Sequence, residues 1–341
     1  MKLVSTLAFA TVLCVSLNAR EQIKMAGSST VFPFSSYVAE EFGATTNYKT
    51  PVVESLGTGG GFKAFCAGDG LDTTDISNAS RPIKLSEFEL CEKNGVTDIS
   101  GVMIGYDGIA VAQSKDNKPI NLTKEQLFLA LAKEVPNEDG KLIPNPYNNW
   151  NQIDKNLENR PIVVYGPPAT SGTRDSFEEQ VMQSASKKFS SYGDKAGKYK
   201  TIREDGKYIP AGENDNLIVQ KLVQDKNALG IFGYSFLVEN PDKITGANIG
   251  GIAPNDKTIA DGSYPIARSL FFYVKNSHKK DVKGLQELVD LYVSDAMIGK
   301  DGVLKTIGLV PMSDETLKRV QKAIKEDIKL TKEMVKAGTV F

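Results

Sequence analysis

Residues 21–42 read EQIKMAGSSTVFPFSSYVAEEF, and this stretch sets the pattern on which the fold is predicted. The short apolar run Gln22–Met25 predicts a buried strand. A helix is predicted over Phe34–Phe42, with Pro33 in its first turn and Gly43 at its end. The residues on the predicted buried face of that helix are Phe34, Tyr37, Val38 and Phe42. The turn between strand and helix holds a glycine and three small hydroxyl residues, so it is rich in neutral hydrogen-bond donors.

The same alternation of strand and helix continues along the chain. Further buried strands are predicted at Pro51–Ser55, Val102–Ala112, Pro161–Tyr165 and Ser269–Val274. A capping box between Thr123 and Gln126 predicts the start of a helix. Other helical segments are predicted at Asp215–Gln224, 282–297 and 314–336. The pattern indicates an α/β fold.

Composition excludes some classes of function. The chain has 341 residues, 40% of them hydrophobic, which is enough for two globular units. Acidic and basic residues nearly cancel, 42 against 41, so no basic field attracts nucleic acid or anionic lipid. We therefore expect no nucleic-acid partner.

Residues 1–19 resemble an export signal. A positive start at Lys2 is followed by an apolar run and a small-residue cleavage point at Asn18-Ala19. The sequence predicts a periplasmic protein whose mature chain begins near Arg20. A lipid-anchored form is the alternative at Cys14, but the residue before it is Leu13 rather than a small residue.

Two cysteines remain in the predicted mature chain. Cys66 and Cys91 are expected to form a disulfide in an oxidising compartment, closing a loop of roughly 25 residues and contributing about 3 kcal/mol. Two buried thiols are the alternative. No metal site is expected, because no histidine or second cysteine pair is nearby. The single histidine, His278, lies in a polar turn and is predicted to be an exposed loop residue, which argues against a Ser-His-Asp triad.

Three predicted helix starts follow strands through small, glycine-rich turns. They are the turn at Gly27–Thr30, the stretch Gly57–Phe62 and the stretch Ala169–Arg174. The second lacks the Gly-Lys-Ser/Thr of a nucleotide P-loop. Free backbone amides and small hydroxyls at a helix start suit an anion. Ordinary N-capping by Ser and Thr is the alternative.

A fourth loop, Asp75–Ile83, contains Ser80 and Arg81. Arg81 and Arg174 are predicted to supply two guanidinium forks, which match the oxygens of a tetrahedral oxyanion. The alternative is that each arginine pairs with a nearby carboxylate, Arg81 with Glu87 and Arg174 with Glu178.

These loops together resemble the PstS family of phosphate-binding proteins. The matching stretches are GSSTVFPF, GTGGGFKAFC, DISNASRPI and SGTRDSFEE, in that order, with later similar pieces at 213–215, 228–234 and 264–268. The resemblance covers essentially the whole predicted mature chain. It implies a two-lobed, type II periplasmic binding protein that is a non-catalytic receptor without a cofactor.

The resemblance also implies lobe boundaries and a ligand set. One lobe is expected to contain residues 20–106 and 269–341, and the other residues 107–268. Phosphate is expected in the cleft between them. The residues carried over as its ligands are Ser29, Thr30, the Val31 amide, Thr58, Gly59, Ser80, Arg81, Ser171, Gly172, Thr173 and Arg174.

The sequence departs from the best-known members at two acidic positions. Arg81 stands where they carry an aspartate, and Pro167 and Ala169 replace an Arg-x-Asp. A carboxylate matters because it accepts a hydrogen bond from the proton that phosphate keeps near neutral pH, whereas it repels sulfate, which has no such proton. Asp107 and Asp175 are the nearest predicted replacements. A structural role for each is the alternative, for Asp175 that of a favourable charge in the first turn of a helix.

The sequence thus predicts a monomeric phosphate receptor that serves the ABC permease of an inner membrane. A receptor for sulfate, molybdate or another tetrahedral oxyanion is one alternative. An exported phosphoester hydrolase is the other, and it lacks a visible nucleophile with a base or metal beside it.

Overall fold

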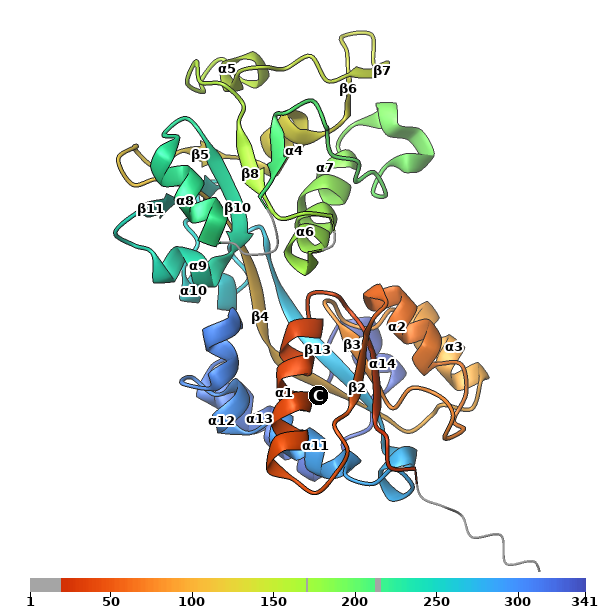
Figure 1. The fold of residues 1–341 in the computed structure, drawn as a ribbon. Coiled ribbons are helices and arrows are strands. Elements are labelled where there is room, and N and C mark those ends of the chain that lie inside the picture. The colour runs from red at the N-terminus through yellow and green to blue at the C-terminus, as the bar shows by residue number, and fades with distance from the viewer. Residues whose placement is uncertain (1–19, 170, 212–215) are drawn as a thin grey trace, which may run out of the picture.

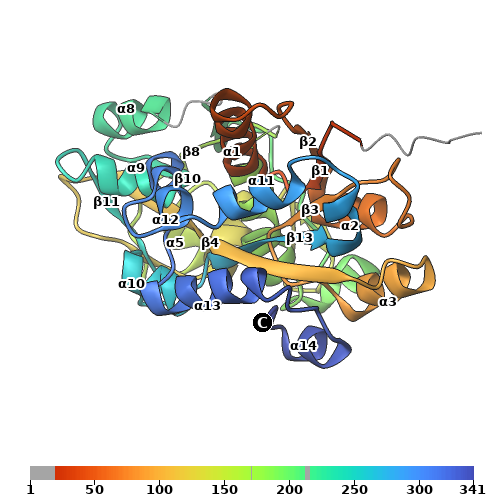
Figure 2. The same ribbon diagram turned by 90° about the horizontal axis from the view of Figure 1, so that it is seen from below.

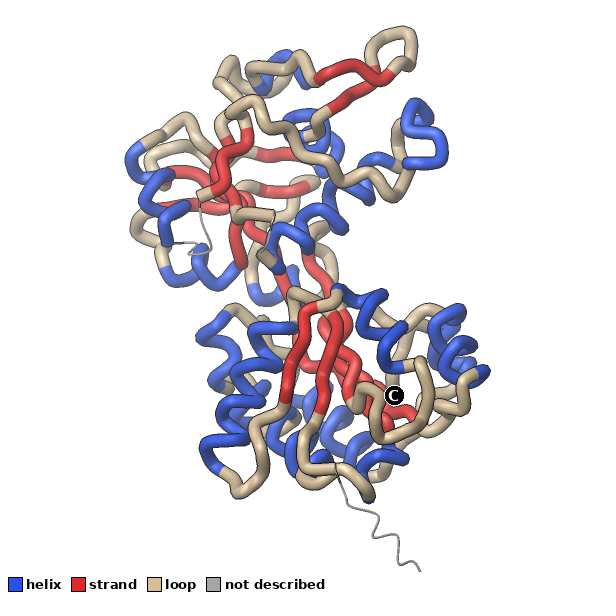
Figure 3. The backbone as a smooth tube through the Cα atoms, turned by 45° about the vertical axis from the view of Figure 1, so that its right-hand side comes forward, coloured by secondary structure: helices blue, strands red, loops and turns tan. Residues whose placement is uncertain are grey.

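The structure is a computed structural model that describes residues 20–169, 171–211 and 216–341. It has two lobes, each with strands in its interior and helices around them (Figures 1 and 3). The predicted export signal and Asp215, the predicted first residue of one helix, lie outside the described residues.

Each lobe has its own apolar core. The core of lobe I is formed by residues within 23–104 and 270–340. The core of lobe II is formed by residues within 109–266, together with Val310. The two-lobed α/β class predicted from the sequence is confirmed, while the boundaries at 106/107 and 268/269 stay a prediction.

Lobe I holds one end of the main sheet, in the order β2-β1-β3-β13-β4, where β4 spans Ile99–Ser114. Strands β1 to β3 are parallel to one another, and β13 runs antiparallel to both β3 and β4. Helix α11 lies on one side of β13 and β4, and α13 lies on the other (Figure 2). The elements are β1 (Lys24–Gly27), α1 (Phe32–Thr45), β2 (Val52–Ser55), α2 (Gly57–Phe65), β3 (Ile76–Ala79), α3 (Leu85–Lys93), β13 (Ala267–Lys275), α11 (Leu285–Tyr292), α12 (Asp295–Ile298), α13 (Asp314–Lys325) and α14 (Lys332–Ala337), with 3₁₀ turns at Asn276–Lys280 and Val303–Ile307.

Lobe II continues the same sheet as β4-β10-β8-β9, with β11 paired to β4. Helix α4 begins with the predicted capping box, in which the Gln126 amide donates to Thr123 Oγ1 at 3.1 Å and the Thr123 amide donates to Gln126 Oε1 at 2.9 Å. The elements are β5 (Asn121–Leu122), α4 (Lys124–Leu131), β6 (Glu134–Pro136), β7 (Leu142–Pro144), α5 (Trp150–Ile153), β8 (Val164–Gly166), α6 (Gly172–Phe177), a π-helix (Glu178–Gln183), α7 (Ser184–Ser186), a 3₁₀ turn (Ser190–Lys195), β9 (Tyr208–Pro210), α8 (Asn216–Gln224), β10 (Leu229–Gly233), α9 (Tyr234–Glu239), β11 (Ile244–Gly246), β12 (Asn248–Ile249) and α10 (Asp256–Ala260).

Two long strands pass between the lobes. Strand β4 (Ile99–Ser114) pairs with β13 over its first part and with β10 over its second. Arg268 on β13 faces Asp107 on β4 in the antiparallel register. Figure 1 shows both strands running from one lobe into the other. We call β4 and β13 the crossing strands.

Two glycine predictions are wrong in detail. Gly43 does not end α1, which runs on to Thr45. A Cβ on Gly43 would lie 2.0 Å from Thr50 Oγ1, so this glycine serves the close packing of the chain that returns from the helix. Gly57 is already the first residue of α2, so the glycine-rich stretch forms the first turns of a helix and not a bare turn before one.

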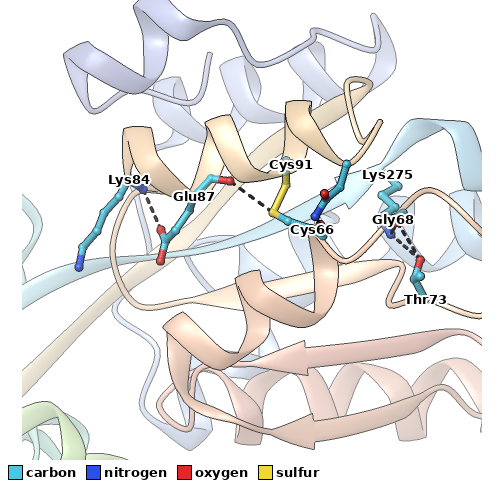
Figure 4. Close-up of a disulfide and its surroundings, with 8 residues drawn as sticks. Cys66, Gly68, Thr73, Lys84, Glu87, Cys91 and Lys275 are labelled. Carbon is cyan, nitrogen blue, oxygen red and sulfur yellow. Dashed lines mark hydrogen bonds between the residues drawn. A yellow bond between two sulfur atoms is a disulfide. The ribbon is translucent and has the colours of Figure 1, made fainter.

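A disulfide joins two helices of lobe I. Cys66 follows the last residue of α2, and Cys91 lies in α3 (Figure 4). The predicted bridge between these cysteines is therefore confirmed. It fixes the helix of the glycine-rich stretch to the helix that follows the Ser80-Arg81 loop.

The prediction for His278 is wrong, because the residue is buried. Its ring nitrogens lie 2.6 Å from Asp75 Oδ1 and 3.1 Å from the Asp69 carbonyl oxygen. Lys275, also buried, donates from Nζ to the Gly68 carbonyl and to Thr73 Oγ1 at 2.6 Å each. The polar turn after β13 is covered because the loop at 68–75 supplies acidic and carbonyl partners for its side chains.

Candidate functional site

A cavity of about 510 Å³ lies between the two lobes. Lobe I contributes the turn after β1 and the start of α1, and lobe II contributes the start of α6 and residues around β10 and α9. Asp107 of crossing strand β4 lies in its wall. The lining residues are Ser29, Thr30, Phe32, Pro33, Phe34, Ser55, Asp107, Ser171, Gly172, Thr173, Gly233, Ser235, Phe236 and Ile307.

The lobe I side of the cavity is the turn between β1 and α1. Gly27 ends the strand with φ of 142°, and a Cβ there would lie 2.1 Å from the Asn78 carbonyl oxygen, so only glycine fits. Ser28 Oγ accepts from the Val31 amide at 3.4 Å. The Val31 amide, predicted as a ligand, is therefore already partnered within the turn. Ser29 and Thr30 face the cavity.

The lobe II side is the start of α6. Ser171 caps this helix, since its Oγ accepts from the Thr173 amide at 3.2 Å. The predicted capping alternative is thus present at this site, alongside the exposure of Ser171, Gly172 and Thr173 to the cavity. The helical segment runs without a break through the π-helix into α7, and Phe177 is buried.

The two sides touch each other at this point. Ser29 Oγ donates to Asp175 Oδ2 at 2.6 Å, and Thr30 Oγ1 lies 3.3 Å from the Gly172 carbonyl oxygen, to which it donates. A Cβ on Gly172 would lie 2.6 Å from the Ser29 carbonyl oxygen. Thr30 and Gly172 are 142 residues apart in the sequence. The turn after β1 and the start of α6 therefore form one polar wall although they lie far apart along the chain.

The two predicted acidic acceptors both lie at this wall. Asp107 lines the cavity and accepts from Ser176 Oγ at 2.8 Å. Asp175 accepts from Ser29. Among the described lining residues, Asp107 carries the only ionisable side chain. Burial raises the pKa of Tyr106, the preceding residue of β4, so its phenol stays neutral near neutral pH.

The second and third predicted loops lie against each other. Thr58 Oγ1 and Ser80 Oγ are 3.0 Å apart, and the Ser80 amide donates to Thr58 Oγ1 at 3.2 Å. Gly59 follows in the first turn of α2, where its missing side chain leaves open space. None of these three is among the described residues that line the cavity, so their role as ligands stays a prediction.

Both predicted arginines bind glutamates, which is the alternative that the sequence left open. Arg81 forms a two-pronged pair with Glu87 at 2.8 and 2.7 Å. Arg174 Nε donates to Glu178 Oε1 at 2.9 Å, and its guanidinium lies 4.6 Å from the ring centre of Tyr208. Their role as anion ligands also stays a prediction.

Sequence reasoning missed the arginine that touches the cavity wall. Arg268 Nη2 donates to Thr30 Oγ1 at 2.6 Å, and its Nη1 donates to Glu179 Oε2 at 2.6 Å. Arg268 Nε lies 3.6 Å from Asp107 Oδ2. The signal was present in the similar piece at 264–268, but only the fold brings this strand beside the turn at Thr30.

The described residues contain no candidate for a metal site or for a membrane-spanning helix. No group of three or more His, Cys, Asp or Glu side chains in this part of the chain is placed to hold a metal ion. No helix among the same residues is both long enough and apolar enough to cross a bilayer.

Two lobes joined by crossing strands, with a polar cavity between them, define the class of bilobed ligand-binding proteins. The PBP superfamily domain matches residues 16–296 of this chain. The "Protein SphX" of Synechococcus elongatus is 31% identical over 321 residues, covering 92% of this chain and 82% of the relative. The "Phosphate-binding protein PstS" of Staphylococcus haemolyticus is 32% identical over 311 residues, covering 89% and 85%.

The chain therefore belongs to the PBP superfamily and, within it, to the family of PstS and SphX, as the sequence motifs predict. A solved structure supports this. The possible phosphate-binding protein from Planctomyces limnophilus is 28% identical, with a TM-score of 0.74, over 91% of this chain and 99% of that one.

Proposed function

We propose that this chain is a receptor that binds inorganic phosphate and delivers it to an ABC importer. The observation that carries the proposal is the polar wall where the Ser29-Thr30 turn of lobe I meets the Ser171–Thr173 helix start of lobe II. Relatives that carry phosphate binding in their names support the same ligand.

The wall suits a tetrahedral oxyanion for a physical reason. Hydroxyls and free amides at a helix start can replace the water that a buried anion loses, and they do so as aimed partial dipoles. Micromolar binding requires only about 8 kcal/mol net, which several charge-assisted hydrogen bonds supply after desolvation. Thr58, Gly59, Ser80, Arg81 and Arg174 complete the proposed ligand set, reached when the lobes move about the crossing strands.

We assign the acidic acceptor to Asp107. Each carboxylate already accepts one hydrogen bond, Asp107 from Ser176 and Asp175 from Ser29. Asp107 lines the cavity directly, whereas Asp175 lies two residues beyond Thr173, the last lining residue of the helix start. An ionised carboxylate accepts a hydrogen bond from the hydroxyl of hydrogen phosphate and repels sulfate, which has no proton to donate. Asp107 is thus the proposed source of selectivity.

We also propose where the receptor acts, which molecules it does not bind and which partner it serves. The receptor is a monomer in the periplasm, exported by residues 1–19 without a lipid anchor. It performs no catalysis, takes no cofactor and binds no nucleic acid. Its lobes meet at residues 106/107 and 268/269, and its partner is the membrane permease of the importer.

Calorimetry tests the function. Purified protein is first dialysed free of phosphate and then titrated with phosphate and, separately, with sulfate. The proposal predicts one phosphate per chain and at least about tenfold weaker binding of sulfate. Asp107→Asn is expected to reduce the difference in affinity between phosphate and sulfate, because the carboxylate charge that repels sulfate is removed. A titration with phosphate that shows no heat change at several temperatures refutes the proposal. Tighter binding of sulfate than of phosphate would show that the receptor serves a different oxyanion.

A further inference from the structure

The guanidinium of Arg268 lies where three parts of the molecule meet. Its backbone is on crossing strand β13, opposite Asp107 of β4. One terminal nitrogen binds Thr30 of the lobe I turn, and the other binds Glu179 of the lobe II helix that starts at the cavity. A single side chain therefore contacts lobe I, lobe II and the strands between them.

One hydrogen-bond donor of the Arg268 guanidinium has no acceptor among the described residues. Its side chain is only 12% exposed, yet Nε has no hydrogen-bond partner among the described residues and is 3.6 Å from the nearest carboxylate oxygen, Oδ2 of Asp107. A buried N–H of an always-charged group is costly to leave unpaired. This donor lies beside Thr30 and Asp107, which both line the cavity.

The present partner of Arg268 is easier to displace than those of the other two arginines. Glu179 is 47% exposed, so water readily solvates its carboxylate once it leaves. Glu178, which holds Arg174, is 11% exposed, and Glu87, which holds Arg81, is 16% exposed. Freeing Arg81 would leave Glu87 without its cation in a poorly hydrated place. Freeing Arg174 would leave Glu178 with Lys200 alone, at 3.3 Å, and still less hydrated than Glu179.

We propose that Arg268 is a further cation of the phosphate site, beside the proposed Arg81 and Arg174, and that Glu179 holds it in place until the anion arrives. Phosphate in the cavity takes over the donors of Arg268, and Glu179 turns out to water. The exchange loosens one contact between crossing strand β13 and the lobe II helix at the moment when the ligand forms new ones across the cleft. This inference rests on the proposed phosphate function.

Four variants test the exchange by calorimetry with inorganic phosphate. Arg268→Ala is expected to weaken binding about 10- to 100-fold, the range of a hydrogen bond to a charged group. Arg268→Lys keeps the charge but not the forked pair of donors, so its affinity for phosphate is expected to lie between those of the wild type and Arg268→Ala. Glu179→Gln removes the competing carboxylate and is expected to tighten binding about threefold or more.

The fourth variant, Glu138→Gln, is the control for charge. It removes one exposed carboxylate of lobe II in the loop between β6 and β7 and is expected to leave the affinity unchanged. A merely structural role for Arg268 and Glu179 predicts lower thermal stability without any tightening in Glu179→Gln.

The outcomes separate this inference from the function on which it rests. A wild-type chain that binds phosphate, with a folded Arg268→Ala that binds equally well, overturns the role of Arg268. Unchanged or weaker binding in Glu179→Gln overturns the exchange. A wild-type chain that does not bind phosphate overturns the proposed function itself, and the inference falls with it.

Discussion

The glycines of α2 allow one pair of substitutions to test the packing of lobe I. A Cβ on Gly61 would lie 2.4 Å from Gly27 Cα and 2.9 Å from the Ala26 carbonyl oxygen, and both are backbone atoms of β1. A Cβ on Gly59, two residues earlier, would meet nothing within 4 Å. A glycine-to-alanine substitution at these two positions of the same helix is thus expected to change stability in opposite directions.

Gly61→Ala is expected to destabilise the protein by about 1–3 kcal/mol, because no flexible side chain can yield to the added methyl group. Gly59→Ala is expected to stabilise it by about 0.5 kcal/mol, because alanine loses less backbone entropy in a helix. Urea unfolding followed by far-ultraviolet circular dichroism measures both. Fluorescence of the single tryptophan, Trp150 of α5, would report on lobe II instead. A Gly61→Ala protein as stable as Gly59→Ala refutes this account of how α2 packs on β1.

Three other predictions concern the cleft, the disulfide and a buried lysine. Gly172→Ala should weaken phosphate binding about tenfold by forcing the lobes apart at the polar wall, whereas Gly68→Ala, whose nearest new contact is at 4.0 Å, should not. Replacing Cys66 and Cys91, 25 residues apart, by serine should cost about 3.5 kcal/mol in urea unfolding, and a loss below about 1 kcal/mol would contradict the loop-closure reasoning. Burial lowers the pKa of Lys275 from 10.5 to about 8. Because the unfolded chain binds this proton more tightly than the folded one, the free energy of unfolding of the wild type, relative to that of Lys275→Met, should rise by about 2–3 kcal/mol between pH 8 and 10. A difference between the two proteins that does not change with pH would contradict this prediction.

Local sequence signals predicted several elements of the fold and part of the site. The strand at Gln22–Met25, the capping box at Thr123 and the small residues at 171–173 each depend on neighbours within a few positions, so the sequence displays them directly. The disulfide followed from the expected compartment and from there being two cysteines after the predicted cleavage point. The motifs of four separate loops together identified the family.

Long-range partners were beyond the reach of such signals. Arg268 is 238 residues from Thr30 and 89 from Glu179, so its place at the cavity wall depends on how β13 crosses between the lobes. His278 lies in a turn that is polar by composition, yet Asp75, 203 residues away, makes it a buried group. Gly43 marks a close approach to Thr50 and not a helix end, since the distinction depends on where the chain returns.

The most direct test of the account is a crystal structure of the protein with saturating phosphate. The account predicts one phosphate in the cavity between the lobes, with oxygens about 2.7–3.2 Å from donors of Thr30 on one side and Thr173 on the other. It also predicts Arg268 bound to the anion, with Glu179 turned away. An ordered phosphate bound outside this cavity, or one bound within it by a single lobe alone, would contradict the central claim that the two loops form one anion site.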